Sequence, residues 1–161
     1  MIIFQTILIL IVTYVTLRSI IPFLIFPGYL FTPKIKKSLS LEKVSMKLRG
    51  KTKEQTLKNA FNFVVSHHFG IAGTIKKVFL IRNAFLNNPE SILGKKIPLY
   101  CHNSNLLLRC LLVNAGLVSE EDIVTKWSFG SDMGIHQYLL ININKKLFKL
   151  DPFYNIFQEI K

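Results

Sequence analysis

Three residues near the end of the chain have the types and the local contexts that cysteine-dependent catalysis uses. Cys101 begins an apolar stretch, His136 stands just before an alternating run, and Asp151 ends a second short run. A thiol can act as a nucleophile, an imidazole can exchange its proton, and a carboxylate can orient the imidazole. We therefore expect Cys101, His136 and Asp151 to form a catalytic triad.

The helix predicted after Cys101 explains why this thiol, rather than Cys110, is the candidate nucleophile. Pro98 ends the preceding segment, and the apolar helix would run to about Ala115, with Gly116 as its C-terminal cap. The N-terminus of a helix lowers the pKa of a thiol there, and its backbone N–H groups can hold an oxyanion. Cys110 lies among leucines on the opposite face, so we expect it in the core and both thiols free.

His136 and Asp151 are expected to meet because the chain folds back between them. Alternating residues predict strands over 137–144 and 146–150, joined by a tight loop at Asn144-Lys145. Pairing across such a loop brings residue 136 roughly opposite residue 153. The imidazole and the carboxylate would therefore lie at the same end of a hairpin.

The elements that must hold the triad come in a simple order. Thr52 and Gln55 have the spacing of a helix start, and the helix would run to about Ser66. A second helical stretch is expected over 74–86, then the Cys101 helix, and after it a first strand over 123–129. Helices followed by an antiparallel sheet predict an α+β fold, with N-terminal helices packed on a small sheet.

These residues carry a resemblance to a known superfamily. The run from Cys101 to Gly116 resembles the nucleophile helix of the transglutaminase-like superfamily, whose core is that of the papain-like cysteine enzymes. His136-Gln137-Tyr138 is similar to the superfamily's His-x-Trp strand start, and Leu150-Asp151-Pro152 to its Asp-Pro signature. Tyr100 departs from the pattern, since a glycine often precedes the nucleophile. The resemblance covers roughly residues 99–155.

The resemblance implies a cysteine peptidase or amidase that works through a thioester acyl-enzyme and needs no cofactor. Hydrolysis is favoured over transamidation, because nothing in the sequence suggests a calcium site or a second-substrate tunnel. The superfamily also contains inactive members. The alternative is therefore a non-catalytic, membrane-tethered module that uses the same cleft to bind a peptide or a partner protein.

Other residues near the triad have simpler interpretations. His102 projects about 100° away from Cys101 along the helix, so we expect it at the surface or rim of the site. Trp127 is expected in the strand core, and the loop 130–134 is a candidate for gating substrate entry. No metal-ligand spacing joins Cys101, His102 and His136, and no metal site is expected.

The N-terminal segment predicts a membrane anchor. Residues 2–17 carry no charged side chain, and the apolar stretch continues to Phe31, interrupted by one arginine, two prolines and a glycine. About 20 apolar residues suffice to cross a bilayer. One tilted span, or a span followed by an interfacial segment, would fit. A cleaved signal peptide and a helix buried against a partner membrane protein are alternatives; the former lacks a basic start and a small-residue cleavage site.

A basic stretch follows the apolar segment. The net charge of the chain is +12, and residues 34–53 hold eight basic residues and one acid. We expect Lys34, Lys36 and Lys37 to bind anionic lipid, which also favours a cytoplasmic position for the domain that follows. Nucleic acid is not the expected partner, because the stretch has no interleaved aromatic residues. The predicted organisation is an anchor over 1–31, a basic juxtamembrane linker over 32–51 and the transglutaminase-like domain over 52–161.

Overall fold

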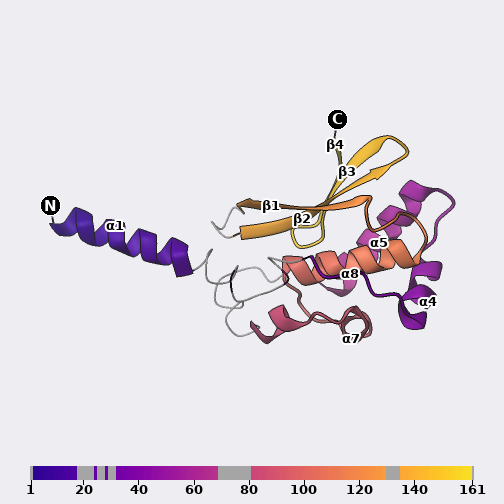
Figure 1. Cartoon of the computed structure of the whole chain (residues 1–161), viewed down its shortest axis with the longest axis horizontal. Coiled ribbons are helices and arrows are strands. Elements are labelled where there is room, and N and C mark those ends of the chain that lie inside the picture. Colours follow the sequence, from indigo (N-terminus) through magenta and orange to yellow (C-terminus); the bar gives the residue numbers. More distant parts are fainter. Residues whose placement is uncertain are drawn as a thin grey trace.

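The computed structural model describes residues 2–17, 24, 28, 32–68, 81–129 and 135–160. Within them, helices precede a four-stranded antiparallel sheet, so the predicted α+β class is confirmed. Figure 1 shows helix α8 (Cys101–Asn114) running along one face of the sheet, with α5 (Lys53–His67) and α4 (Leu39–Lys47) toward the opposite end of the molecule from α1 (Ile2–Val15).

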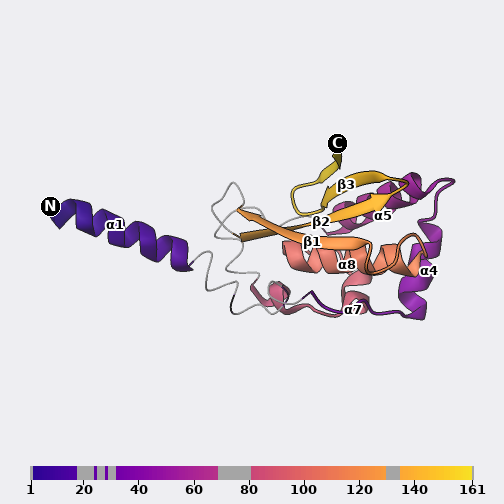
Figure 2. The same ribbon diagram turned by 45° about the horizontal axis from the view of Figure 1, so that its top comes forward.

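Helix α1 extends away from the rest of the molecule in both ribbon views (Figures 1 and 2). Its apolar side chains are exposed on every side; Ile3 and Phe4 are 77 % and 72 % accessible. Among the described residues, no helix has the length and apolarity that crossing a bilayer requires. The predicted span over 2–31 extends into residues that lie outside the described ones.

The predicted ends of α5 and α8 are present. The Thr52 side chain accepts a hydrogen bond from the Gln55 backbone N–H, as expected, and caps α5. At the end of α8, Gly116 has a φ of +67°, and its N–H donates to the Val113 carbonyl while Leu117 N–H donates to Leu112. This is a Schellman motif, and its left-handed position favours glycine, which has no side chain.

The sheet has the order β1-β2-β3-β4 with every neighbouring pair antiparallel. Its strands are β1 (Ile123–Phe129), β2 (Ile135–Ile143), β3 (Lys146–Asp151) and β4 (Ile156–Ile160). Asn144 and Lys145 both have positive φ, so the predicted tight hairpin loop between β2 and β3 is confirmed. The pairing of β2 with β3 runs from Ile143 opposite Lys146 to Leu139 opposite Leu150. Strand β4 was not predicted.

The core lies between this sheet and the helices. The middle of α8 contributes leucines that are fully buried against Leu139 and Ile141 of β2. Helix α5 packs on α8, and the ring of its Phe61 meets Phe157 of β4 edge to face at 5.4 Å. The small helix α7 (Pro89–Leu93) and the 3₁₀ turn η2 (Ile81–Phe85) complete the layer on the far side of α8 (Figure 2). Burial on both sides fixes α8 rigidly under the sheet.

The basic stretch expected as a linker is packed against the domain. Helix α4 forms within this stretch, and its Leu41 is fully buried in the same core as α5 and α8. Buried Arg109 of α8 donates to the Pro33 carbonyl at 3.0 Å and to Glu120 at 3.0 Å. Residues 32–38 are therefore held in place before α4 begins.

Lys36 forms an ion pair with Glu90 at 3.6 Å, and Lys34, Lys36 and Lys37 are all exposed. The helix expected over 74–86 is described only from residue 81, where the chain forms η2 rather than an α-helix. The rest of that stretch and the expected gating loop 130–134 lie outside the described residues.

Candidate active site

Helix α8 begins at Cys101, as the sequence predicts. Tyr100 occupies the N-cap position but makes no side-chain capping bond, and the first backbone bond of the helix runs from Ser104 N–H to the Tyr100 carbonyl. The thiol therefore lies in the first turn, where the helix dipole favours negative charge and the N–H groups of the turn point toward the site.

His136 and Asp151 form a buried pair. His136 Nε2 lies 2.6 Å from Asp151 Oδ2, and the two residues are 5 % and 2 % exposed. The second carboxylate oxygen accepts a hydrogen bond from Tyr154 N–H at 3.2 Å, which fixes the plane of the carboxylate. The hairpin register thus produces the contact that the sequence predicted.

The thiol completes this arrangement. Cys101 and His136 are joined by a side-chain hydrogen bond, so the three predicted residues are brought together in the order thiol, imidazole, carboxylate. Because His136 Nε2 is engaged by Asp151, proton exchange with the sulfur falls to Nδ1. The carboxylate therefore fixes the orientation of the ring toward the thiol.

The surroundings shift both members of the thiol–imidazole pair. Burial raises the pKa of Cys101, but the neighbouring imidazoles of His102 and His136 outweigh it and lower the pKa to about 6. Burial lowers the pKa of His136, but the hydrogen bonds to Asp151 and Cys101 raise it to about 9. At neutral pH the site therefore holds a thiolate beside an imidazolium, the form in which cysteine is nucleophilic.

Aromatic and small apolar groups enclose the pair. Ala84, Tyr100, Ile135 and Phe153 surround the thiol, which is only 3 % exposed. The His136 ring lies 4.5 Å from the ring of Tyr154 and 5.5 Å from that of Phe153. This enclosure strengthens the charge–charge interactions of the pair and limits access of a substrate to the sulfur.

His102 is not at the rim of the site, as the sequence analysis expected, but buried at 4 % exposure. Its Nε2–H donates to the Ala84 carbonyl at 2.8 Å. The expectation failed because it counted only the direction of the side chain on α8. It did not include η2, which covers that side of the helix start.

Two further polar residues tie α8 to the sheet beside the triad. Asn105, one turn after Cys101, donates from Nδ2 to the Gln137 carbonyl at 2.9 Å and approaches Gln137 Oε1 at 3.3 Å. Both residues are nearly fully buried. The sequence contained a signal for them, because Asn105 follows Cys101 by four positions and Gln137 adjoins His136, so each shares a neighbourhood with a triad residue.

Cys110 occupies the position expected of a structural thiol. It is fully buried among the leucines of α8, and burial raises its pKa. Trp127, in contrast, is 44 % exposed and does not belong to the core that the sequence predicted for it. It pairs in register with Gln137, the residue after His136.

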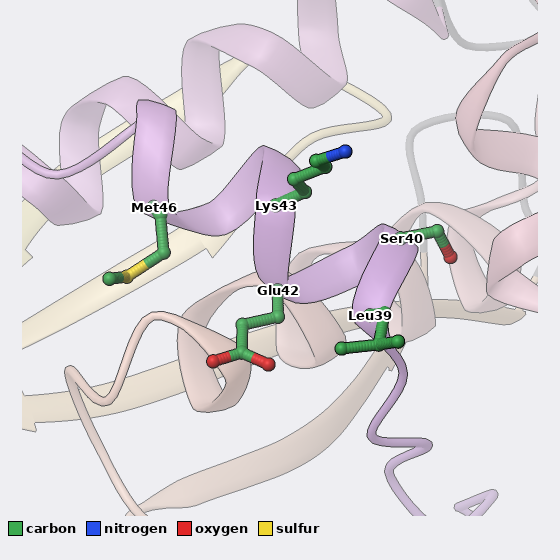
Figure 3. A pocket seen from close by; sticks show the side chains of 5 residues that line it. All are labelled: Leu39, Ser40, Glu42, Lys43 and Met46. Carbon is green, nitrogen blue, oxygen red and sulfur yellow. The ribbon is translucent and has the colours of Figure 1, made fainter.

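Other features lie apart from the triad. A surface hollow is lined by residues of α4 alone among the described residues, and Figure 3 shows the side chains of Leu39, Lys43 and Met46 around it. It contains no triad residue and contributes nothing to the chemistry. Within the described ranges, no group of three or more His, Cys, Asp or Glu side chains has a geometry that could hold a metal ion.

Comparison of the chain with protein-family models, with curated proteins and with solved structures found no match. The arrangement of Cys101, His136 and Asp151 therefore carries the functional argument by its own chemistry.

Proposed function

We propose that this protein is a cysteine hydrolase that cleaves an amide or peptide bond through a thioester acyl-enzyme. The observation that carries the proposal is the 2.6 Å contact of His136 with Asp151, on a ring that also hydrogen-bonds to the Cys101 thiol at a helix start. Nucleophile, base and orienting group are thus within reach of one another, which is the geometric requirement for this chemistry.

The proposed reaction has two steps. The Cys101 thiolate attacks the carbonyl carbon, the N–H groups of the first turn of α8 stabilise the oxyanion, and the His136 imidazolium gives its proton to the leaving amine nitrogen. Neutral His136 then takes a proton from water as the water oxygen attacks the thioester. The C–S bond breaks, and the carboxylic acid leaves with the thiolate–imidazolium pair restored.

A transglutaminase-like core is the fold that we propose for this site. The helix start with its cysteine, the strand that carries histidine and the following strand that ends in aspartate occur in the chain order that the resemblance implies. We also propose a membrane-associated protein. The exposed apolar side chains of α1 and the exposed Lys34 and Lys37 support this, and the position of the lysines favours a cytoplasmic domain.

One observation favours a second candidate function. Because the Cys101 thiol is only 3 % exposed, a carbonyl group cannot reach it without some movement of the enclosing side chains. A non-catalytic module that binds a peptide or a partner membrane protein has no need of such access. The two candidates differ in the reactivity of the thiol, so a labelling experiment separates them.

The test is acylation of the full chain by a p-nitrophenyl ester at neutral pH, followed by mass spectrometry of the two cysteine peptides. We expect an acyl group on Cys101 that hydroxylamine removes, and none on Cys110. The Cys101→Ser variant should fold with an unchanged circular dichroism spectrum and lose the labelling. Equal reactivity of Cys101 and Cys110 in the native protein would support the binding module instead.

A further inference from the structure

A buried amide ties the helix of the nucleophile to the strand of the base. Asn105 lies on α8 one turn after Cys101, so the two side chains share one face of the helix. Its Nδ2 donates to the backbone carbonyl of Gln137, the residue after His136 on β2, at 2.9 Å. The bond therefore joins close neighbours of the two groups that the proposed reaction brings together.

The orientation of the Asn105 amide follows from its partner. A backbone carbonyl only accepts hydrogen bonds, so the atom that faces it must be Nδ2 and not Oδ1. Nδ2 also lies 3.3 Å from Oε1 of the Gln137 side chain, whose Nε2 in turn donates to the Gly28 carbonyl at 3.4 Å. The two N–H groups of Nδ2 thus have two acceptors, both on one residue of β2.

The oxygen of this amide is not satisfied in the same way. Asn105 is 1 % exposed, and its Oδ1 has no hydrogen-bond partner among the described residues. A buried polar atom without a partner destabilises the fold. Leucine, which fills most of the neighbouring buried positions of α8, would avoid that cost. Packing therefore does not account for an asparagine at this position.

The contact of α8 with β2 needs a directional bond beside the triad. Other polar side chains of α8 hold different parts of the chain, since Asn103 donates to the Leu86 carbonyl and Arg109 to the Pro33 carbonyl. The leucines that pack against β2 make contacts without a preferred direction. A hydrogen bond, in contrast, holds its donor and acceptor roughly 2.7–3.2 Å apart. The bond of Asn105 thus restricts the place of α8 along β2 in a way that the leucines do not.

We propose that Asn105 is a positioning residue for the proposed reaction. Its bond to the Gln137 carbonyl fixes where α8 lies along β2, and so holds the Cys101 thiol within reach of His136. Asn105 transfers no proton and acts through the two elements that it joins. This inference rests on the proposed function.

Substitution of Asn105 leaves the charges around the thiol in place, because Asn105 carries none. Within the described residues, the titratable groups around the thiol and its base are His102, Tyr100, His136, Asp151 and Tyr154. A change in the pH dependence of the thiol's reactivity in an Asn105 variant therefore reports how the imidazole lies relative to the sulfur, and not the loss of a charge.

The experiment measures how fast iodoacetamide alkylates Cys101 as a function of pH, while Cys110 in the same chain reports any general loosening of the core. Asn105→Leu keeps roughly the size of the side chain and removes the donor together with the unpartnered Oδ1. We expect labelling of Cys101 below neutral pH to slow by about tenfold, with the profile displaced by about one unit to higher pH. Labelling of Cys110 and the melting temperature should change little, because a bond and a buried unpartnered atom are lost together. A wild-type profile of Cys101 in Asn105→Leu would overturn the inference.

Asn103→Leu is the matched control. Asn103 is also a buried asparagine of α8, at 0 % exposure, and its Oδ1 likewise has no partner among the described residues. Its Nδ2, however, donates to the Leu86 carbonyl at 2.8 Å and not to β2. The Cys101 profile of Asn103→Leu should therefore match the wild type. An equal displacement in both variants would contradict a specific role of Asn105.

Asn105→Ala provides a second variant in case Asn105→Leu does not fold. It removes the donor without introducing a branched side chain, and it should move the Cys101 profile in the same direction. A folded Asn105→Ala protein with the wild-type profile would also overturn the inference.

Failure of this inference is distinguishable from failure of the proposed function. If Cys101 of the wild type is no more reactive than Cys110, both fail. If Cys101 is reactive and depends on His136 but not on Asn105, only the positioning role fails.

Discussion

One helix carries two cysteines in opposite chemical states. Cys101 at the start of α8 and Cys110 in its middle are both free and buried, at 3 % and 0 % exposure. Yet the pKa of Cys101 is lowered to about 6, whereas burial raises that of Cys110. Two thiols with nearly equal burial therefore differ in whether they are ionised at neutral pH.

The difference comes from hydrogen bonding and not from nearby positive charge alone. The Arg109 guanidinium adjoins Cys110, but its hydrogen bonds go to the Pro33 carbonyl and to Glu120. Cys101 has the His136 imidazole, which hydrogen-bonds to it, and lies at the positive end of the helix dipole. A buried thiolate thus requires donors aimed at the sulfur, and a cation whose donors are used elsewhere does not provide them.

Removal of the base, His136, should have the largest effect on the difference in pKa between Cys101 and Cys110. In His136→Ala, the pKa of Cys101 should return to the range of an ordinary or buried thiol, so that the thiolate fraction at pH 7 falls on the order of a hundredfold. Iodoacetamide labelling of Cys101, followed by peptide mass spectrometry, measures this. His67→Ala, at a half-buried histidine of α5, is the control. Labelling of His136→Ala at the wild-type rate would contradict the pairing.

Neutralising the carboxylate should have a smaller effect, confined to alkaline pH. The Cys101 thiolate and the His136 imidazolium coexist at pH values between the pKa of Cys101, about 6, and that of His136, about 9. Asp151→Asn keeps the shape but removes the charge that raises the pKa of His136. The alkaline limb of the rate of ester hydrolysis should therefore move down by about one pH unit. An alkaline limb that stays in place would show that Asp151 does not tune the imidazole.

Substitution of Cys110 should change the stability of the protein and not the reactivity of Cys101. Cys110→Ala removes a fully buried side chain from the leucine core and should lower the free energy of unfolding by about 1 kcal/mol. Urea unfolding measures that loss, while acylation of Cys101 should stay at the wild-type rate. Loss of acylation in a folded Cys110→Ala protein would remove the functional distinction between the two positions.

The sequence could predict what local rules determine. Thr52 with Gln55, Gly116 after an apolar run, and Asn144-Lys145 between alternating segments each specify a cap or a turn, and each is found. The pairing of His136 with Asp151 followed from the loop, because a two-residue hairpin leaves little freedom in register.

The predictions that failed concern residues whose surroundings are set by tertiary contacts. His102 is buried because η2 and Gly28 cover it, and neither contact has a local signal. Trp127 lies on the edge strand β1 and is exposed, and the position of a strand in its sheet cannot be read from its own residues. Strand β4 escaped prediction since its five residues are too short for a clear alternation.

The hairpin between β2 and β3 also determines when the site can become reactive during folding. His136 and Asp151 are 15 residues apart in one hairpin, so their contact can form early and locally. Cys101 precedes His136 by a helix and a strand, and its sulfur meets the ring only after α8 has docked on the sheet. Until then the thiol keeps the ordinary pKa of a free cysteine and is mostly protonated at neutral pH. A newly synthesised or partly unfolded chain therefore lacks the activated thiolate, which forms only once α8 has docked on the sheet.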